Sequence, residues 1–329
     1  MPPVRERMRS RTVIDNLVVN RLQGGLFGMI GNVYHVNTAS AAFPGNDSNT
    51  GLSYEFPLLT ITAALSKCVA GRNDYILIHD YYQATGETWP IVVNKRQVHI
   101  FGVAQQNLPY PVIHPTGDTP AFILGSAGQY SEIGYLTLGG GDSFGGINIE
   151  FYTGSAQQGQ VDGVWIHHNT FGYVWFGTPA CGIQKMAGSI HPSHSVLIED
   201  NEFLGDLING KGKIAGKAID ILGTTDGKAI KNWIIRHNRF MSCEMAINLI
   251  RAYDAQIYGN KVVMPDAKVG EAVSLGANCL NAMVDDNVAL KGMLTNGYTN
   301  NPYRDLSAQP VNHWSRNYRG NVVIEPIGA

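Results

Sequence analysis

A six-residue phrase recurs through the second half of the chain and constrains its fold more than any other feature. It consists of an aliphatic residue, two mostly polar residues, Asn, any residue and an apolar residue. Successive asparagines are 32, 37, 22 and 27 residues apart. Repeats of this length are typical of solenoids, in which each repeat buries its apolar face against its neighbours. The asparagines are Asn169, Asn201, Asn238, Asn260 and Asn287.

Positions counted from the Asn predict two apolar ladders in the interior of the solenoid. The third residue before the Asn is aliphatic in every repeat, and the second residue after it is aromatic in the first three. Because side chains alternate along a strand, both positions would point inward and stack on their equivalents. These residues are Ile166, Ile198, Ile235, Ile257 and Val284 before the Asn, and Phe171, Phe203, Phe240, Val262 and Ala289 after it.

The Asn itself is expected where the chain bends between strands. Its amide can bond the backbone of its own turn and the Asn above and below. Asn also tolerates the left-handed backbone conformation that such bends need. We therefore interpret the asparagines as a structural ladder and not as catalytic residues.

The fourth residue before the Asn should point outward, yet it is large and apolar in most repeats. An exposed apolar strip usually marks an interface, so we predict an assembly face there; the alternative is a loop of the same chain that covers the strip. The second residue before the Asn also points outward, and there Glu199 and Arg236 would be neighbours that pair. The predicted assembly face consists of Trp165, Leu197, Ile234 and Met283.

A second apolar phrase alternates with the first along the chain. Its period of two predicts a strand, so each coil has at least two strands separated by turns. The outward residues of this phrase would form a polar row, which consists of Asn148, Gln184, Asp220, Asn248 and Ser274.

The N-terminal part has a different composition. We expect residues 1–35 to form an extended arm for docking or assembly, because a basic segment is followed by an apolar, glycine-rich one. Residues 36–74 would hold turns and a short helix with Thr60 as its N-cap and Gly71 as its stop, and residues 75–329 the solenoid. The docking residues would be Arg5, Arg7, Arg9, Arg11, Leu26, Phe27, Met29 and Ile30.

The run GNDSNTGLSYEFPLLTITAALSKCVAGRNDYILIHDYY resembles the opening of pectate-lyase-like right-handed parallel β-helix proteins. In that superfamily a turn-rich segment leads to a short helix that caps the first coil. The resemblance covers about residues 35–325 and implies an all-β fold: a right-handed parallel β-helix with a capping helix and an N-terminal arm. It does not imply one function, because this fold carries many.

Composition excludes several partners. A net charge of −2 gives no general attraction to nucleic acid, and no apolar run is long enough for a membrane span. The basic N-terminus is not followed by an apolar segment, so we expect no secretion signal. The four cysteines have no metal-binding spacing and are expected to be reduced and buried.

No catalytic constellation is evident in the sequence. A glycoside hydrolase needs paired carboxylates on one face, and only Asp220 and Glu150 are weak candidates. The histidines at 167, 168, 191 and 194 lack acidic or Cys companions at suitable spacing, and the Asp47 turn lacks the glutamate of a calcium loop. We therefore predict no metal ion and no cofactor.

These features are similar to those of virion proteins of tailed bacteriophages, which use β-helix trimers as spikes or capsid decorations. The resemblance implies a structural capsid decoration (cement) protein or short spike, trimeric, assembled in the host cytoplasm and bound to a capsid or other virion protein. The alternatives are a carbohydrate-active enzyme, such as a phage depolymerase, lyase or glycoside hydrolase, and a glycan-binding module. For the module, the aromatic candidates are Tyr152, Tyr173 and Trp175.

Overall fold

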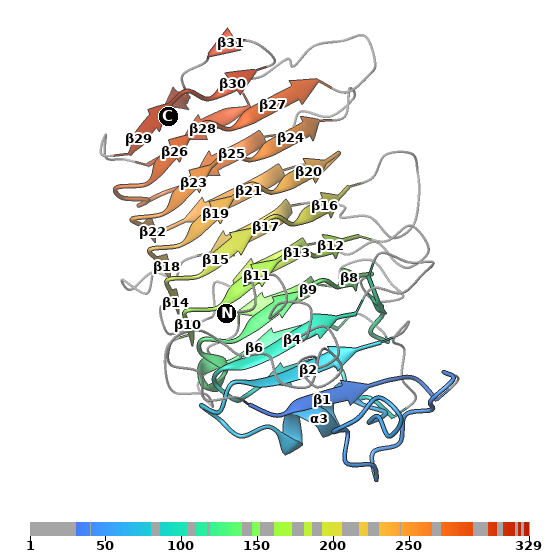
Figure 1. Ribbon diagram of the computed structural model, residues 1–329. Helices are drawn as coiled ribbons and strands as arrows, with labels where there is room; N and C mark the ends of the chain where they lie inside the picture. The colour runs from blue at the N-terminus through green and yellow to red at the C-terminus, as the bar shows by residue number, and fades with distance from the viewer. Residues whose placement is uncertain are drawn as a thin grey trace, which may run out of the picture.

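The computed structural model is a parallel β-helix, which confirms the predicted fold class (Figure 1). Within the described residues, all strand pairs are parallel except the last pair of one sheet. The structure describes residues 31–39, 41–79, 86–103, 110–116, 119–139, 147–151, 161–172, 181–185, 193–205, 217–222, 230–243, 245–264, 271–291, 302–307, 312–319, 322–323 and 326–328. The predicted docking residues, His191, Tyr152, Tyr173 and Trp175 lie outside these ranges.

The described strands stack in four sheets. Sheet A has ten strands: β1 (Val33–Val36), β2 (Asp74–Ile78), β4 (Val98–Gly102), β7 (Glu132–Gly134), β11 (Trp165–His167), β15 (Leu197–Glu199), β19 (Ile234–Arg236), β23 (Gln256–Tyr258), β26 (Met283–Asp285) and β29 (His313–Ser315). Sheet B has nine strands: β5 (Val112–Ile113), β8 (Thr137–Leu138), β12 (Thr170–Phe171), β16 (Glu202–Leu204), β20 (Arg239–Met241), β24 (Lys261–Met264), β27 (Val288–Lys291), β30 (Tyr318–Arg319) and β31 (Val322–Val323).

Sheet C has nine strands: β3 (Ile91–Val93), β6 (Phe122–Leu124), β9 (Ile147–Phe151), β13 (Cys181–Lys185), β17 (Lys217–Leu222), β21 (Met245–Ile250), β25 (Glu271–Leu275), β28 (Tyr303–Asp305) and β32 (Ile327–Gly328). A short sheet has four strands: β10 (Val161–Asp162), β14 (Ser193–His194), β18 (Ile230–Lys231) and β22 (Ala252–Tyr253). The predicted second phrase therefore forms sheet C, and the Asn phrase spans sheets A and B.

From β7 onward, a tight bend joins each strand of sheet A to the next strand of sheet B. The residue that takes the left-handed conformation is the one before the Asn, for example Asp200 with φ of 53° and His237 with φ of 54°. The expectation that the Asn itself is left-handed is therefore wrong. The Asn keeps ordinary backbone angles, and its side chain points inward where it can bond its neighbours.

The Asn ladder is continuous and buried. The Asn201 amide donates to the Ile166 carbonyl at 2.9 Å and to Asn238 Oδ1 at 3.1 Å. Its own Oδ1 accepts from the backbone and side-chain nitrogens of Asn169 at 3.0 and 3.1 Å. The same pattern continues through Asn260 and Asn287 to Asn317, one more rung than the sequence repeat revealed. The structural reading of the ladder is therefore supported by complete hydrogen bonding of its amides.

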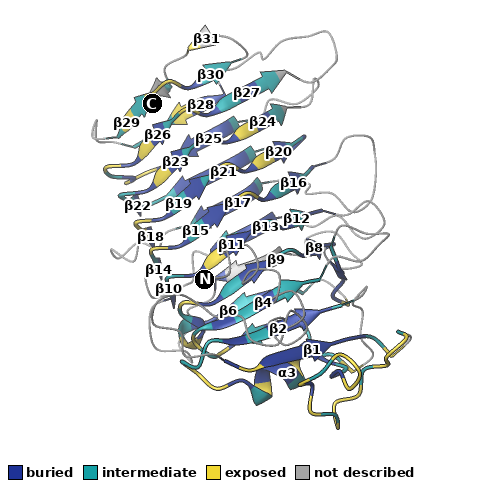
Figure 2. Cartoon of the chain, in the orientation of Figure 1, coloured by how far each residue is buried: buried dark blue, intermediate teal, exposed yellow. Residues whose placement is uncertain are grey.

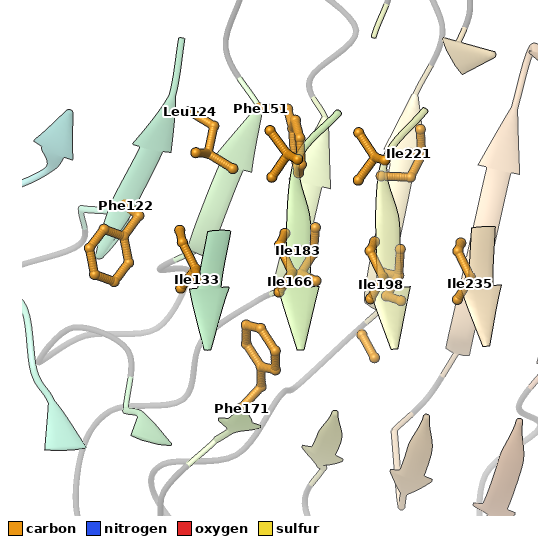
Figure 3. Close-up of a cluster of buried hydrophobic side chains, with 14 of the residues drawn as sticks. Phe122, Leu124, Ile133, Phe151, Ile166, Phe171, Ile183, Ile198, Ile221 and Ile235 are labelled. Carbon is orange, nitrogen blue, oxygen red and sulfur yellow. The ribbon is translucent and has the colours of Figure 1, made fainter. Parts of the chain in front are cut away.

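The interior contains both predicted apolar ladders, together with inward residues of sheet C (Figure 3). Ile166, Ile198 and Ile235 are fully buried beneath sheet A. On sheet B, Phe171 stacks on Phe203 with ring centroids 4.5 Å apart, and Phe203 stacks on Phe240 at 4.8 Å. The core runs as one cluster from the capping helix to the last coils, as the dark blue strands in Figure 2 show.

Helix α3 (Ile61–Lys67) closes the N-terminal end of the solenoid beneath β1. Thr60 is its N-cap, as predicted, and accepts a hydrogen bond from the Ala63 amide at 3.0 Å. Two carboxylates from distant segments satisfy further amides at this end: Asp47 bonds the Thr60 amide, and Glu87 bonds the Ile61 amide, both at 2.8 Å. Asp47 thus has a structural role at the N-terminus of the helix.

Two sequence expectations for helix and strand ends need correction. The helix was expected to continue to Gly71 but ends at Lys67, because the next free amide, that of Val69, bonds the Asp74 carboxylate at 2.6 Å. The apolar run from Ile133 to Leu138 predicts a single strand. It forms β7 and β8 with a bend at Tyr135, where φ is 59°.

Strand β1 spans the predicted boundary at residue 35 and pairs with β2. All four cysteines are free and buried, as expected. In the part of the chain that the structure describes, no helix has the length and apolar character needed to cross a membrane.

Lys185 is an exception in this apolar interior. It is fully buried between Phe151 and Ile221 on adjacent coils, and its Nζ has no hydrogen-bond partner. Burial disfavours the charged ammonium and lowers the pKa of Lys185 to about 8. The interior therefore holds a basic group that costs stability whenever it is protonated.

We predict that Asn201→Ala lowers the free energy of unfolding by roughly 3–5 kcal/mol, because it leaves several buried donors and acceptors without partners at about 1–3 kcal/mol each. Urea unfolding followed by circular dichroism measures this change. Asn94→Ala, at an exposed position, is the control and should change stability by less than about 0.5 kcal/mol. Equal effects of the two substitutions would contradict the ladder's role.

Lys185→Met should stabilise the folded state at neutral pH by on the order of 3 kcal/mol. The folded-state pKa of about 8 lies below the unfolded-state value. The penalty is therefore complete below pH 8 and disappears as the pH rises above the unfolded-state pKa of about 10.4. Urea unfolding at neutral and alkaline pH should show the two proteins converging, whereas exposed Lys231→Met should show no such trend. A pH-independent difference for Lys185→Met would contradict the prediction.

Candidate functional site on the outer face of sheet A

The outer face of sheet A carries the predicted apolar row. Trp165, Leu197 and Ile234 lie directly above one another, followed by Gln256 and Met283. Trp165 is 36% exposed and Met283 38% exposed, which is unusual for residues of this size. Leu197 and Ile234 are half-buried by their neighbours. Figure 2 shows yellow segments in β11, β23 and β26, where only the first residue of each strand is exposed.

Below Trp165, a chain of hydrogen-bonded side chains crosses three coils. Glu132 lies between two histidines: His99 Nδ1 is 2.6 Å from Oε2, and His167 Nε2 is 2.7 Å from Oε1. His167 Nδ1 in turn lies 2.9 Å from Nδ1 of His168. We call His99, Glu132, His167 and His168 the His–Glu chain.

Aromatic rings enclose the His–Glu chain. Tyr75 stacks on His99 with centroids 4.5 Å apart, and Tyr135 stacks on His168 at 4.9 Å. The Trp165 ring lies 4.1 Å from the His167 ring. These rings leave His167 almost fully buried although it points away from the core. His167 points outward, as predicted for the second residue before the Asn, but aromatic rings surround it in place of solvent.

The electrostatics of the chain follow from this enclosure. Burial acts to raise the pKa of Glu132, but hydrogen bonds from His167 and His99 more than offset it, so the pKa lies below its usual value. Burial and the nearby Glu132 charge raise the pKa of Tyr75. Glu132 is therefore an ionised hydrogen-bond acceptor. The two imidazole nitrogens that face it, His99 Nδ1 and His167 Nε2, are accordingly the ones that carry protons.

This arrangement determines what His168 can do. Since His167 Nε2 donates to Glu132, the Nδ1 of neutral His167 accepts the proton of His168 Nδ1. The other nitrogen of His168, Nε2, then keeps its lone pair. His168 is half-buried at the bend, so this nitrogen has the chemistry of a general base with an oriented relay behind it.

Ion pairs continue the same outward row above the His–Glu chain. Arg236 Nε lies 2.5 Å from Glu199 Oε2, as predicted from the repeat, and its Nη1 donates to the Tyr258 hydroxyl at 2.9 Å. Two coils further, Arg316 pairs with Asp285. The edge of sheet A nearest the bend therefore carries ion pairs, whereas the neighbouring row that contains Trp165 and Met283 is largely apolar.

The carboxylate candidates on sheet C are arranged differently from the prediction. Asn148 was expected opposite Gln184, but the register places Glu150 there, with Asp220 on the other side of Gln184. Glu150 and Asp220 thus share one row, two coils apart. Asp220 is buried and occupied: Lys217 Nζ lies 3.1 Å from its Oδ1, and Asn248 donates to the same oxygen at 2.7 Å.

Sequence reasoning missed His99 and Glu132. Their coils lack the Asn of the repeat, since Leu136 stands where the next coil has Asn169. The sequence nevertheless contains a signal that could have located Glu132, because the segment Glu132 to Leu138 keeps the apolar spacing of the repeat. Alignment on Ile133 places Glu132 directly under Trp165. The acidic companion that the sequence spacing did not reveal is Glu132 of this adjacent coil.

Comparisons with known proteins leave the activity of the chain open. The profile of the family described as "Protein of unknown function (DUF1565)" matches residues 43–169. No curated protein matches the chain. An alginate lyase from Paenibacillus sp. str. FPU-7 is 15% identical with a TM-score of 0.40, covering 79% of this chain and 94% of that one. A GH136 lacto-N-biosidase from Eubacterium ramulus is 10% identical with a TM-score of 0.44, covering 86% of this chain and 68% of that one.

Proposed function

We propose that this protein is a structural β-helix that associates laterally through the outer face of sheet A, as a trimeric decoration or short spike of a bacteriophage virion. The observation that carries the proposal is the row of Trp165, Leu197, Ile234 and Met283, which stays exposed or half-buried in the isolated chain. Burying apolar surface of this kind stabilises association by about 25 cal/mol per Å².

The surroundings of the row fit an interface better than an accidental patch. Its residues are held on rigid strands rather than on loops, so little conformational entropy opposes binding. The Glu199–Arg236 and Asp285–Arg316 pairs follow one edge and would form a polar rim. Trp165 is the residue best suited as an anchor, because large aromatic side chains dominate binding energy at interfaces.

The double variant Trp165→Asp, Met283→Asp should dissociate the assembly into monomers. Each substitution places a charge in an apolar contact and should weaken association on the order of 30-fold. Analytical ultracentrifugation of the full chain measures the change. Phe56→Asp is the control, because Phe56 is 63% exposed on the N-terminal cap, away from the row.

In particles, the double variant and, separately, deletion of residues 1–30, which leaves β1 intact, should each reduce incorporation of the protein, measured by quantitative mass spectrometry of purified virions. A wild-type chain that sediments as a strict monomer, or normal incorporation of both variants, would contradict the proposal.

A second candidate function is saccharide binding with turnover, and the His–Glu chain is the observation that favours it. Trp165 and Tyr75 offer ring surfaces on which a sugar could stack. Next to them, His168 and Glu132 provide an oriented base and an ionised carboxylate. In this candidate, His168 takes a proton from the saccharide and Glu132 holds the imidazoles in register.

This candidate predicts release of unsaturated or reducing ends when the protein is incubated with bacterial surface polysaccharides. Glu132→Gln should lower the rate by at least about 100-fold, since it removes the acceptor that orients both imidazoles. Glu202→Gln, on sheet B, is the matched control and should leave the rate unchanged. No release by the wild-type chain from a broad polysaccharide panel, or equal rates for both variants, would exclude this function.

A further inference from the structure

Three metal-ligating side chains converge at the bend between sheets A and B, one coil above the His–Glu chain. Glu199, Asp200 and His237 each offer a ligand atom, and these atoms lie within 4.8 Å of one another. Across the described ranges, no other three such groups converge in this way. We propose that Glu199, Asp200 and His237 bind a divalent transition-metal ion such as zinc.

The backbone brings these ligands together with little freedom. Glu199 ends β15 and stands opposite Arg236 in the register, so the residues that follow, Asp200 and His237, occupy the same bend position on adjacent coils. Both have the left-handed conformation, with φ of 53° and 54°. The hydrogen bonds between Asn201 and Asn238 hold the two bends together. The site is thus preorganised by the ladder.

The donor set indicates the class of metal. Two carboxylates and one imidazole suit zinc and similar first-row ions, whereas calcium and magnesium prefer oxygen ligands alone. Three protein ligands also leave a coordination position for water. Such a set differs from the His–Glu chain, where the groups bond one another in a line and share no common point.

The neighbours of the ligands support this assignment. Arg236 donates to only one oxygen of Glu199, Oε2, and its Nη1 is held by Tyr258. It therefore orients the carboxylate, as groups behind metal ligands commonly do. The formal charges of the two carboxylates and the Arg236 guanidinium sum to a negative value, which favours a cation.

A glycine makes room for the imidazole. A Cβ at Gly259, the bend residue of the next coil, would lie 2.6 Å from Cδ2 and 3.1 Å from Nε2 of His237. A side chain at position 259 would push the His237 ring away from this place, next to Asp200. The glycine is specific to the coil next to His237, since the equivalent bend residue one coil further is Asp286.

The test is isothermal titration calorimetry of the EDTA-treated full chain with zinc chloride, with cobalt(II) absorption as a second readout of an imidazole ligand. The wild-type chain should bind one equivalent. His237→Asn and Asp200→Asn should each weaken binding at least tenfold, and both keep a residue that tolerates the left-handed bend. His313→Asn, at an exposed position of sheet A, is the matched control and should bind as the wild type does.

Circular dichroism of the metal-free variants verifies that they fold. The inference is overturned if the wild-type chain takes up no stoichiometric zinc, or if His237→Asn and Asp200→Asn bind zinc as tightly as the control. Because binding is measured directly, the result does not depend on assembly or on saccharide turnover.

Discussion

The hydrogen bonds between stacked asparagines are the interaction on which the rest of this structure depends. The Asn201 amide donates to two backbone carbonyls and to Asn238, and its oxygen accepts from Asn169; the other asparagines likewise donate to the backbone of the preceding coil and to the next Asn. No single apolar contact could fix the coils in register, because aliphatic ladders tolerate sliding. A buried amide does not, since every shift leaves donors unpaired at a cost of about 1–3 kcal/mol each.

Fixed register turns a repeated sequence into a patterned surface. Once the bends are aligned, equivalent residues lie one strand spacing apart, about 4.8 Å, and each outward position becomes a straight row. That spacing lets Glu132 reach histidines on both adjacent coils, and it places Asp200 beside His237. The buried ladder and the exposed sites are therefore consequences of one geometry.

Residues that recur at a fixed distance from the repeated Asn could be predicted from the sequence. Residues on coils that lack this Asn could not. The rows of Ile166, Phe171 and Trp165 followed from counting positions relative to the Asn, because the bend fixes that count. Glu132 and His99 lie on coils without the Asn, so the count could not reach them. The sheet C register was also misassigned: moving Asn148 by two residues leaves every side chain on the same face, so alternation cannot detect the shift.

The two proposed uses of the sheet A face exclude each other in space. Trp165 is both the anchor of the apolar row and part of the wall above His167. A neighbouring subunit seated on Trp165 would cover the His–Glu chain, so a saccharide could reach His168 only in an unassembled chain. Glu199, Asp200 and His237 lie beside the row, at the bend, and Asp200 and His237 are exposed. An ion there would remain accessible in either case, and it would set its positive charge at the rim of the assembly face.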